Sequence, residues 1–162
     1  MIYAEARSKI QSGDVLAWTH IRWSSWNDIQ IQIVRIFTRS EYSHVGIAWV
    51  VGGRVFVLEA VSQGVRIFPL SRELPFYWLP VGVWDETREE MALALVGAPY
   101  SKWDAVLSFF GRLVKGENAS WQCSEYVAFV LGLDPARYTP TNIVSHLQDR
   151  GATLSKIIKD AR

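Results

Sequence analysis

The stretch YSHVGIAWVVGGRVFVLEA, residues 42–60, decides the fold. Two strand-like apolar runs, Val45–Val51 and Arg54–Ala60, flank the pair Gly52-Gly53. Two glycines between such runs are a strong signal for a two-residue β-hairpin turn, because both turn positions need positive φ. The sequence therefore predicts an antiparallel pair of strands in the middle of the chain.

The hairpin register places a histidine and a glutamate on one face. With the turn at Gly52-Gly53, Gly46 faces Glu59 and His44 faces Val61. Strand side chains alternate, so His44 and Glu59 are diagonal neighbours, about 7–8 Å apart at the backbone. Gly46 leaves space opposite the carboxylate. A turn of odd length would instead put the two side chains on opposite faces.

A carboxylate beside a histidine fixes the tautomer, orients the ring and supports the imidazolium. Such a pair also occurs as a surface ion pair or as a buried histidine that is satisfied locally. His44 and Glu59 alone do not decide between these interpretations. The position of the single cysteine bears on the choice.

Cys123 lies near the start of an apolar helix that is predicted from about Trp121 to Leu131, before Gly132. Ser120 is a good N-cap, which places Cys123 at the third helical position. Amides of a first helical turn lack intrahelical partners, so they stabilise a thiolate and can hold an oxyanion. The alternative is a small buried hydrophobe. Together with the His–Glu pair, the helix start favours a thiol nucleophile.

The remaining patterns predict an α+β domain. Further strands are expected at 15–19, 64–68 and 77–84, and further helices at 2–10, 27–37, 87–96, 102–110 and 139–151. Thr87 and Glu90 form a capping box, and Thr139-Pro140 is a typical helix start. We expect a single domain over residues 1–162, an antiparallel β-sheet packed with helices.

Composition excludes several classes of protein. The net charge is +1, so bulk charge gives no reason to expect a nucleic acid partner. One cysteine cannot form an internal disulfide. Residues 1–10 have no signal-peptide core, and no run approaches the roughly 18 apolar residues of a transmembrane segment. We therefore expect a cytoplasmic protein by default, with export by another route left open.

The tryptophans and the other histidines are less informative. Trp18, Trp23 and Trp26 lie close together and indicate either core packing or a groove for a lipid, sugar or peptide. His20 and His146 are isolated, and we interpret both as structural or surface residues. The sequence has neither a CxxC pair nor an HExxH motif, so we expect no metal and no cofactor.

The order of six motifs resembles the circularly permuted NlpC-type papain-like enzymes, and more closely their YiiX-like branch. The motifs are Gly13-Asp14, Tyr42-Ser43-His44-Val45-Gly46, Leu58-Glu59-Ala60, Gly97-Ala98-Pro99-Tyr100, Gln122-Cys123-Ser124-Glu125 and Thr139-Pro140. The resemblance covers about residues 11–147. The histidine precedes the cysteine here, and permutation of the family's usual order produces that arrangement.

The resemblance implies that Cys123 is the nucleophile, His44 the general base and Glu59 the residue that orients His44. Tyr42 and Gln122 flank this site and are candidates to position substrate or donate to the oxyanion. Relatives in the wider group cleave amide bonds of cell-wall peptides, and others act on lipid esters or amides or transfer acyl groups.

The expected function is a cysteine-dependent hydrolase that cleaves an amide bond, in a peptide such as a cell-wall peptide, through a Cys-His-Glu triad and an acyl-enzyme. One alternative is a lipid amidase, esterase or acyltransferase on the same fold. Another is a binding module without catalysis. Substrate is therefore a peptide or an acyl lipid under the two enzymatic hypotheses.

Overall fold

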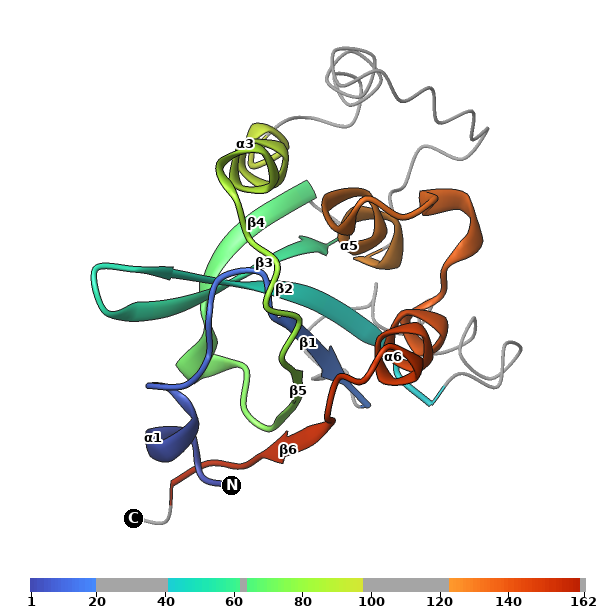
Figure 1. Ribbon diagram of the computed structural model, residues 1–162. Coiled ribbons are helices and arrows are strands. Elements are labelled where there is room, and N and C mark those ends of the chain that lie inside the picture. Colours follow the sequence, from blue (N-terminus) through green and yellow to red (C-terminus); the bar gives the residue numbers. More distant parts are fainter. Residues whose placement is uncertain (20–40, 62–63, 98–122, 161–162) are drawn as a thin grey trace, which may run out of the picture.

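The computed structural model of the protein describes residues 1–19, 41–61, 64–97 and 123–160. Within these ranges a six-stranded sheet, antiparallel throughout, has the order β4-β3-β2-β1-β5-β6 (Figure 1). Its strands are β1 (Val15–Trp18), β2 (His44–Val51), β3 (Arg54–Val61), β4 (Gly64–Pro69), β5 (Phe76–Leu79) and β6 (Ser155–Ile157). The α-helices are α1 (Tyr3–Ala6), α3 (Glu86–Ala94), α5 (Cys123–Leu131) and α6 (Pro140–Asp149), with 3-10 turns η1 (Leu70–Arg72) and η3 (Pro135–Arg137). The predicted α+β class with an antiparallel sheet is confirmed.

The central hairpin has the predicted register. Its strands pair without a break from Ile47 opposite Leu58 to the turn. The turn residues Gly52 and Gly53 have φ of 57° and 71°, in the left-handed region that a two-residue hairpin turn needs. The sequence signal and the backbone geometry therefore agree at this turn.

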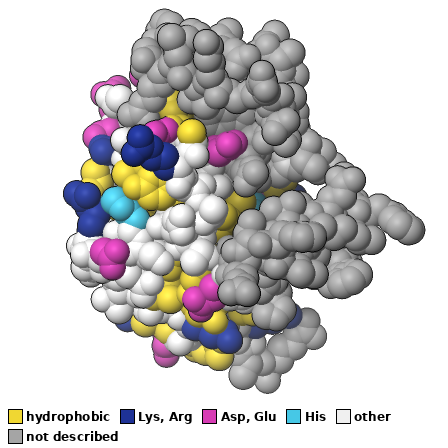
Figure 2. Space-filling model, turned by 90° about the vertical axis from the view of Figure 1, so that its right-hand side faces the viewer, with side chains coloured by type: hydrophobic (Ala, Val, Ile, Leu, Met, Phe, Trp, Pro, Cys, Tyr) yellow, Lys and Arg dark blue, Asp and Glu magenta, His cyan; other side chains and the backbone are white. Residues whose placement is uncertain are grey.

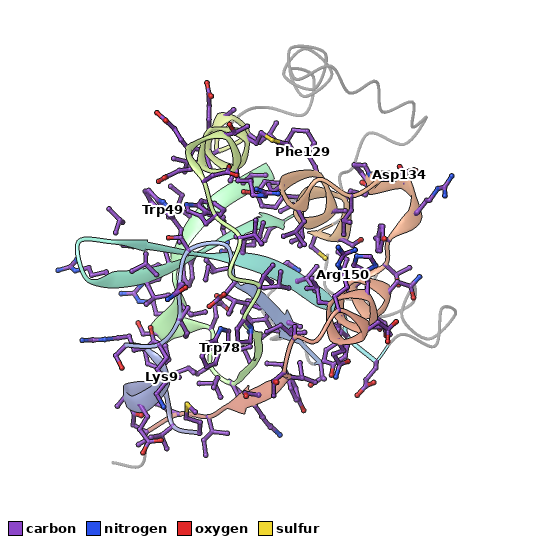
Figure 3. All side chains as sticks on the ribbon, viewed as in Figure 1. Lys9, Trp49, Trp78, Phe129, Asp134 and Arg150 are labelled. Atoms are coloured by element: carbon purple, nitrogen blue, oxygen red, sulfur yellow. The ribbon has the colours of Figure 1, made fainter. Side chains whose placement is uncertain are left out.

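The sheet separates two hydrophobic cores. Helices α3, α5 and α6 cover one face, and α1 and η1 cover the other (Figure 1). Phe129 on α5 belongs to the first core and Trp78 on β5 to the second; side chains fill the space on both sides of the sheet (Figure 3). Because side chains alternate along each strand, His44, which pairs with Trp18 of β1, lies on the second face.

Helix α5 is fixed in the first core along most of its length. Tyr126, Val127 and Phe129 are fully buried. The Tyr126 hydroxyl donates to the carbonyl of Ala92 in α3 at 3.0 Å, and burial raises the pKa of this phenol. The helix ends where Gly132 adopts a φ of 80°. These contacts hold the start of α5, and with it Cys123, against the sheet.

The fourth predicted strand was too long. It was expected to run over 77–84, but β5 ends at Leu79, directly before Pro80. The next backbone N–H, that of Val81, donates to the buried Asp14 carboxylate at 3.0 Å instead of to a neighbouring strand. Gly82 then turns the chain with a φ of 67°. The short strand β6, at the other edge of β5, was not predicted.

Two helix predictions also need correction. The helix expected over 2–10 is only the four residues of α1. Turns follow it, in which the backbone N–H groups of Lys9 and Ile10 donate to the carbonyl of Ala6. The N-cap of α3 is Asp85 and not Thr87, because the Asp85 carboxylate accepts from the Arg88 N–H at 2.8 Å. The predicted start of the last helix is confirmed, since α6 begins at Pro140 and Thr139 Oγ1 accepts from the Asn142 N–H at 3.2 Å.

Some predictions fall outside the described residues, namely the helices at 27–37 and 102–110. In the described ranges, no helix is long and apolar enough to cross a membrane. The face of α5 and α6 carries interspersed positive and negative side chains, and the described residues visible there form no patch of a single sign (Figure 2).

Candidate active site

His44 and Glu59 meet as the hairpin register predicts. His44 is the first residue of β2, and its side chain is 21% exposed. Its Nε2 lies 2.6 Å from Glu59 Oε2. A Cβ built on Gly46 would lie 3.4 Å from the Glu59 Cβ, so this glycine does face the glutamate. The carboxylate therefore fixes the orientation of the imidazole from one side.

The Glu59 side chain is almost completely buried, with 3% exposed. Its second oxygen, Oε1, accepts from Arg66 Nε at 2.7 Å. Burial raises the pKa of this carboxyl, but the hydrogen bond and charge of His44 and the charge of Arg66 outweigh burial and hold the pKa below its usual value. Glu59 is therefore ionised at neutral pH.

Cys123 and His44 act on each other's pKa, since the charge and hydrogen bond of each side chain shift the pKa of the other. The interaction involves the first residue of β2, and the backbone N–H groups of Val45 and Ser124 also lower the pKa of the thiol. This position lets a residue of α5, on the first face, reach a histidine on the second.

The electrostatics favour a charged pair. Burial raises the pKa of the Cys123 thiol, but the charge and hydrogen bond of His44 and the two backbone N–H groups lower it overall. Burial lowers the pKa of His44, but the charge and hydrogen bond of Cys123, followed by those of Glu59, raise it to about 10. Both shifts run in the direction of a thiolate beside an imidazolium, a pair that combines a nucleophile with a proton donor.

Of the two candidate substrate-binding residues, the structure describes Tyr42 but not Gln122. Tyr42 is buried, its ring packs edge-on against Tyr77 with centroids 5.5 Å apart, and its backbone N–H donates to Thr141 Oγ1 at 3.1 Å. These contacts fix the chain just before His44, and a role of Tyr42 toward substrate stays a prediction. Gln122 lies outside the described residues, as does the predicted cap Ser120.

Two residues, Trp18 and Arg66, contact His44 or Glu59 and were not predicted to do so. Trp18 packs against the His44 ring, with centroids 5.4 Å apart, and its indole N–H donates to the Glu73 carbonyl at 2.7 Å. Arg66 is the cross-strand partner of Glu59. The pairing of Arg66 with Glu59 could have been predicted from the sequence. A tight connection between the predicted strands 54–60 and 64–68 places Arg66 opposite the glutamate.

No protein-family model matches the chain, and no curated protein matches it. The fold is similar to the crystal structure of metalloprotein YiiX from Escherichia coli O157:H7, with 22% sequence identity and a TM-score of 0.50. The match covers 75% of this chain and 64% of that one, so the chain spans less than two thirds of the length of YiiX. At this identity the likeness shows a shared fold.

The described part of this chain does not fit a metal centre. It contains no group of three or more His, Cys, Asp and Glu residues arranged to hold a metal ion. At the candidate site, Glu59 already accepts from His44 Nε2 and from Arg66, and a neighbouring guanidinium repels a cation. The imidazole at this site is instead hydrogen-bonded to the Glu59 carboxylate and acts on the pKa of the Cys123 thiol.

Proposed function

We propose that this protein is a cysteine-dependent hydrolase with Cys123 as nucleophile, His44 as acid and base, and Glu59 as the group that orients His44. The observation that carries the proposal is the row Cys123–His44–Glu59, whose members come from α5, β2 and β3. The lowered pKa of the thiol and the raised pKa of the imidazole support the same roles.

The geometry supports acyl transfer in two steps. The Cys123 thiolate attacks the carbonyl carbon of an amide, and the carbonyl oxygen becomes an oxyanion near the first amides of α5. The His44 imidazolium gives its proton to the departing amine, which leaves a thioester on Cys123. Neutral His44 then takes a proton from water, the hydroxide attacks the thioester, and the carboxylic acid departs as the thiolate returns.

We further infer that the chain is a circularly permuted NlpC-type papain-like domain of the YiiX-like kind. The chain order of histidine before cysteine and the similarity of its fold to YiiX support this inference. The same inference makes a peptide amide, such as one in a cell-wall peptide, the leading substrate class.

Only one tryptophan of the groove expected under the lipid alternative lies in the described part of the chain. Of Trp18, Trp23 and Trp26, only Trp18 belongs to the described residues, and it is buried against His44 instead of lining open surface. The binding-module alternative requires an unreactive thiol, whereas the charge and hydrogen bond of His44 lower the pKa of Cys123. We therefore place amide hydrolysis first and include acyl esters in the substrate panel.

The deciding experiment is the rate of Cys123 alkylation by iodoacetamide against pH, because the chain has one cysteine and the signal has a single source. We expect wild type to label rapidly at about pH 6, well below the pKa near 8.5 of a free thiol. His44→Ala should move the midpoint up toward that value. Labelling that follows an ordinary thiol in both proteins would reject the proposal.

A substrate panel then follows the labelling result. Short peptides with cell-wall-type amide bonds and acyl-chain esters should be offered in parallel, with Cys123→Ala as the inactive control. Release of a free amine by wild type but not by the alanine variant supports amide hydrolysis. Turnover of the esters alone would favour the lipid alternative.

A further inference from the structure

Arg66 holds the Glu59 carboxylate from the side opposite to His44. Oε1 of Glu59 accepts from Arg66 Nε at 2.7 Å, while Oε2 lies 2.6 Å from His44 Nε2. Each carboxylate oxygen thus has its own charged partner. In a side chain that is almost completely buried, this arrangement fixes both the position and the rotation of the carboxylate.

Arg66 is itself held in place, although its side chain is 41% exposed. Its guanidinium carbon lies 4.4 Å from the ring centroid of Phe68, and one Nη lies 3.5 Å from Glu73 Oε1. The Glu73 carbonyl accepts from the indole of Trp18, whose ring packs on His44.

The contacts therefore form a closed series that includes the imidazole. The members of this series, in order, are His44, Glu59, Arg66, Glu73 and Trp18.

We propose that Arg66 is a positioning residue that, through Glu59, sets the proportion of thiolate at Cys123. This inference rests on the function proposed above. The residues that carry it come from separate elements, since Arg66 lies on β4, Glu59 on β3 and Cys123 on α5.

A charge count gives the direction of the effect. The ionisable groups that face one another here are Cys123 on α5, His44 on β2, Glu59 on β3 and Arg66 on β4, with Glu73 beyond Arg66. In the thiolate form the first four charges cancel. Without Arg66 the same form carries a net negative charge, because Glu59 loses its second cationic partner, so deprotonation of the thiol beside the imidazolium becomes less favourable.

The test compares alkylation profiles of folded variants. Arg66→Gln should raise the pH midpoint of Cys123 labelling by about one unit, at the low end of the range for charges that act at short distance. Arg66→Lys, which returns the charge without the planar fork, should recover part of the shift. Arg54→Gln, an exposed arginine at the turn end of β3, is the matched control and should label like wild type.

A double variant shows whether Arg66 acts through the glutamate. In a Glu59→Gln background the buried charge is gone, so Arg66→Gln should add almost no further shift. This double variant also avoids an unpaired buried carboxylate, so it serves if Arg66→Gln alone fails to fold.

Two results would overturn the inference while the proposed function stands. The first is an activated wild-type thiol with the same midpoint in Arg66→Gln. The second is an Arg66→Gln shift of equal size with and without Glu59. An ordinary thiol in wild type would instead remove the proposed function, and this inference with it.

Discussion

The indole of Trp18 lies against the imidazole of His44, with ring centroids 5.4 Å apart and planes inclined by 46°. The two residues face each other across β1 and β2, and Trp18 is 6% exposed. The indole N–H is tied to the carbonyl of Glu73 at 2.7 Å. His44 is therefore confined by a ring on one side and by the Glu59 carboxylate at its edge.

We expect Trp18→Leu to slow the labelling of Cys123 at about pH 6 several-fold, because the imidazole gains rotational freedom and pairs less well with the thiolate. The variant should also lose up to about 3 kcal/mol of stability, within the range for truncation of large buried side chains. Rates of alkylation and thermal midpoints check both effects.

Trp49→Leu is the matched control for this prediction. Trp49 lies on β2 as His44 does, but it packs with the first core, and its indole N–H donates to Glu89 at 2.8 Å. This variant should lose stability without a change in labelling rate. Equal slowing in both variants would show that labelling follows general stability and not contact with His44.

Gly46 is required for steric reasons. A Cβ there would lie 2.6 Å from Val57 Cγ2 and 3.1 Å from the Leu58 carbonyl oxygen, so β3 would have to move and carry Glu59 with it. We expect Gly46→Ala to cost about 1–3 kcal/mol, the usual range for overpacking, and to slow Cys123 labelling. Urea unfolding and alkylation rates measure the two effects.

Val57→Ala provides the control for the glycine substitution, because it removes the nearest clashing atom. The double variant should be less destabilised than the sum of the single variants. Strict additivity would mean that Val57 does not limit the space at Gly46.

The fold class was accessible from the sequence because its strongest signals are local. The Gly52-Gly53 turn, the alternation along the central hairpin and the Thr139-Pro140 helix start each depend on neighbouring residues. The order of β1, β5 and β6 in the sheet depends on pairing between segments that are distant in the chain. No local pattern encodes such pairing, which is why β6 escaped prediction.

The contrast between local signals and long-range pairing also applies to the residues of the candidate site. His44 and Glu59 could be brought together from the hairpin register alone, since 15 residues and one tight turn separate them. Cys123 could be placed near them only through the helix-start argument and the family resemblance. The contact between Trp18 and His44 needs the pairing of β1 with β2, and it was therefore missed.

The cap of α3 was missed for a local reason, and it gives a direct test. The sequence around it offers two capping residues, and the structure uses Asp85, whose Oδ1 accepts from the Arg88 N–H at 2.8 Å. We expect Asp85→Ala to lower the free energy of unfolding by about 1 kcal/mol, as for other N-cap substitutions. Thr87→Ala should cost clearly less, and a larger loss for Thr87 would restore the original capping box.

We expect Glu59 to make the free energy of unfolding depend on pH. Its pKa in the folded protein is lower than 4.5, because the contacts with His44 and Arg66 outweigh burial. An ionised Glu59 therefore stabilises the folded state above its unfolded pKa, and this contribution is lost as pH falls through the folded pKa. Glu59→Gln removes the titrating group, so wild type should exceed this variant in stability by more at about pH 6 than at about pH 3.5.

Urea unfolding of both proteins at the two pH values measures that difference, and Glu5→Gln, at an exposed position on α1, controls for the loss of a carboxylate in general. A gap between wild type and Glu59→Gln that stays constant over this interval would show that the carboxylate gains nothing from its partners in the folded state.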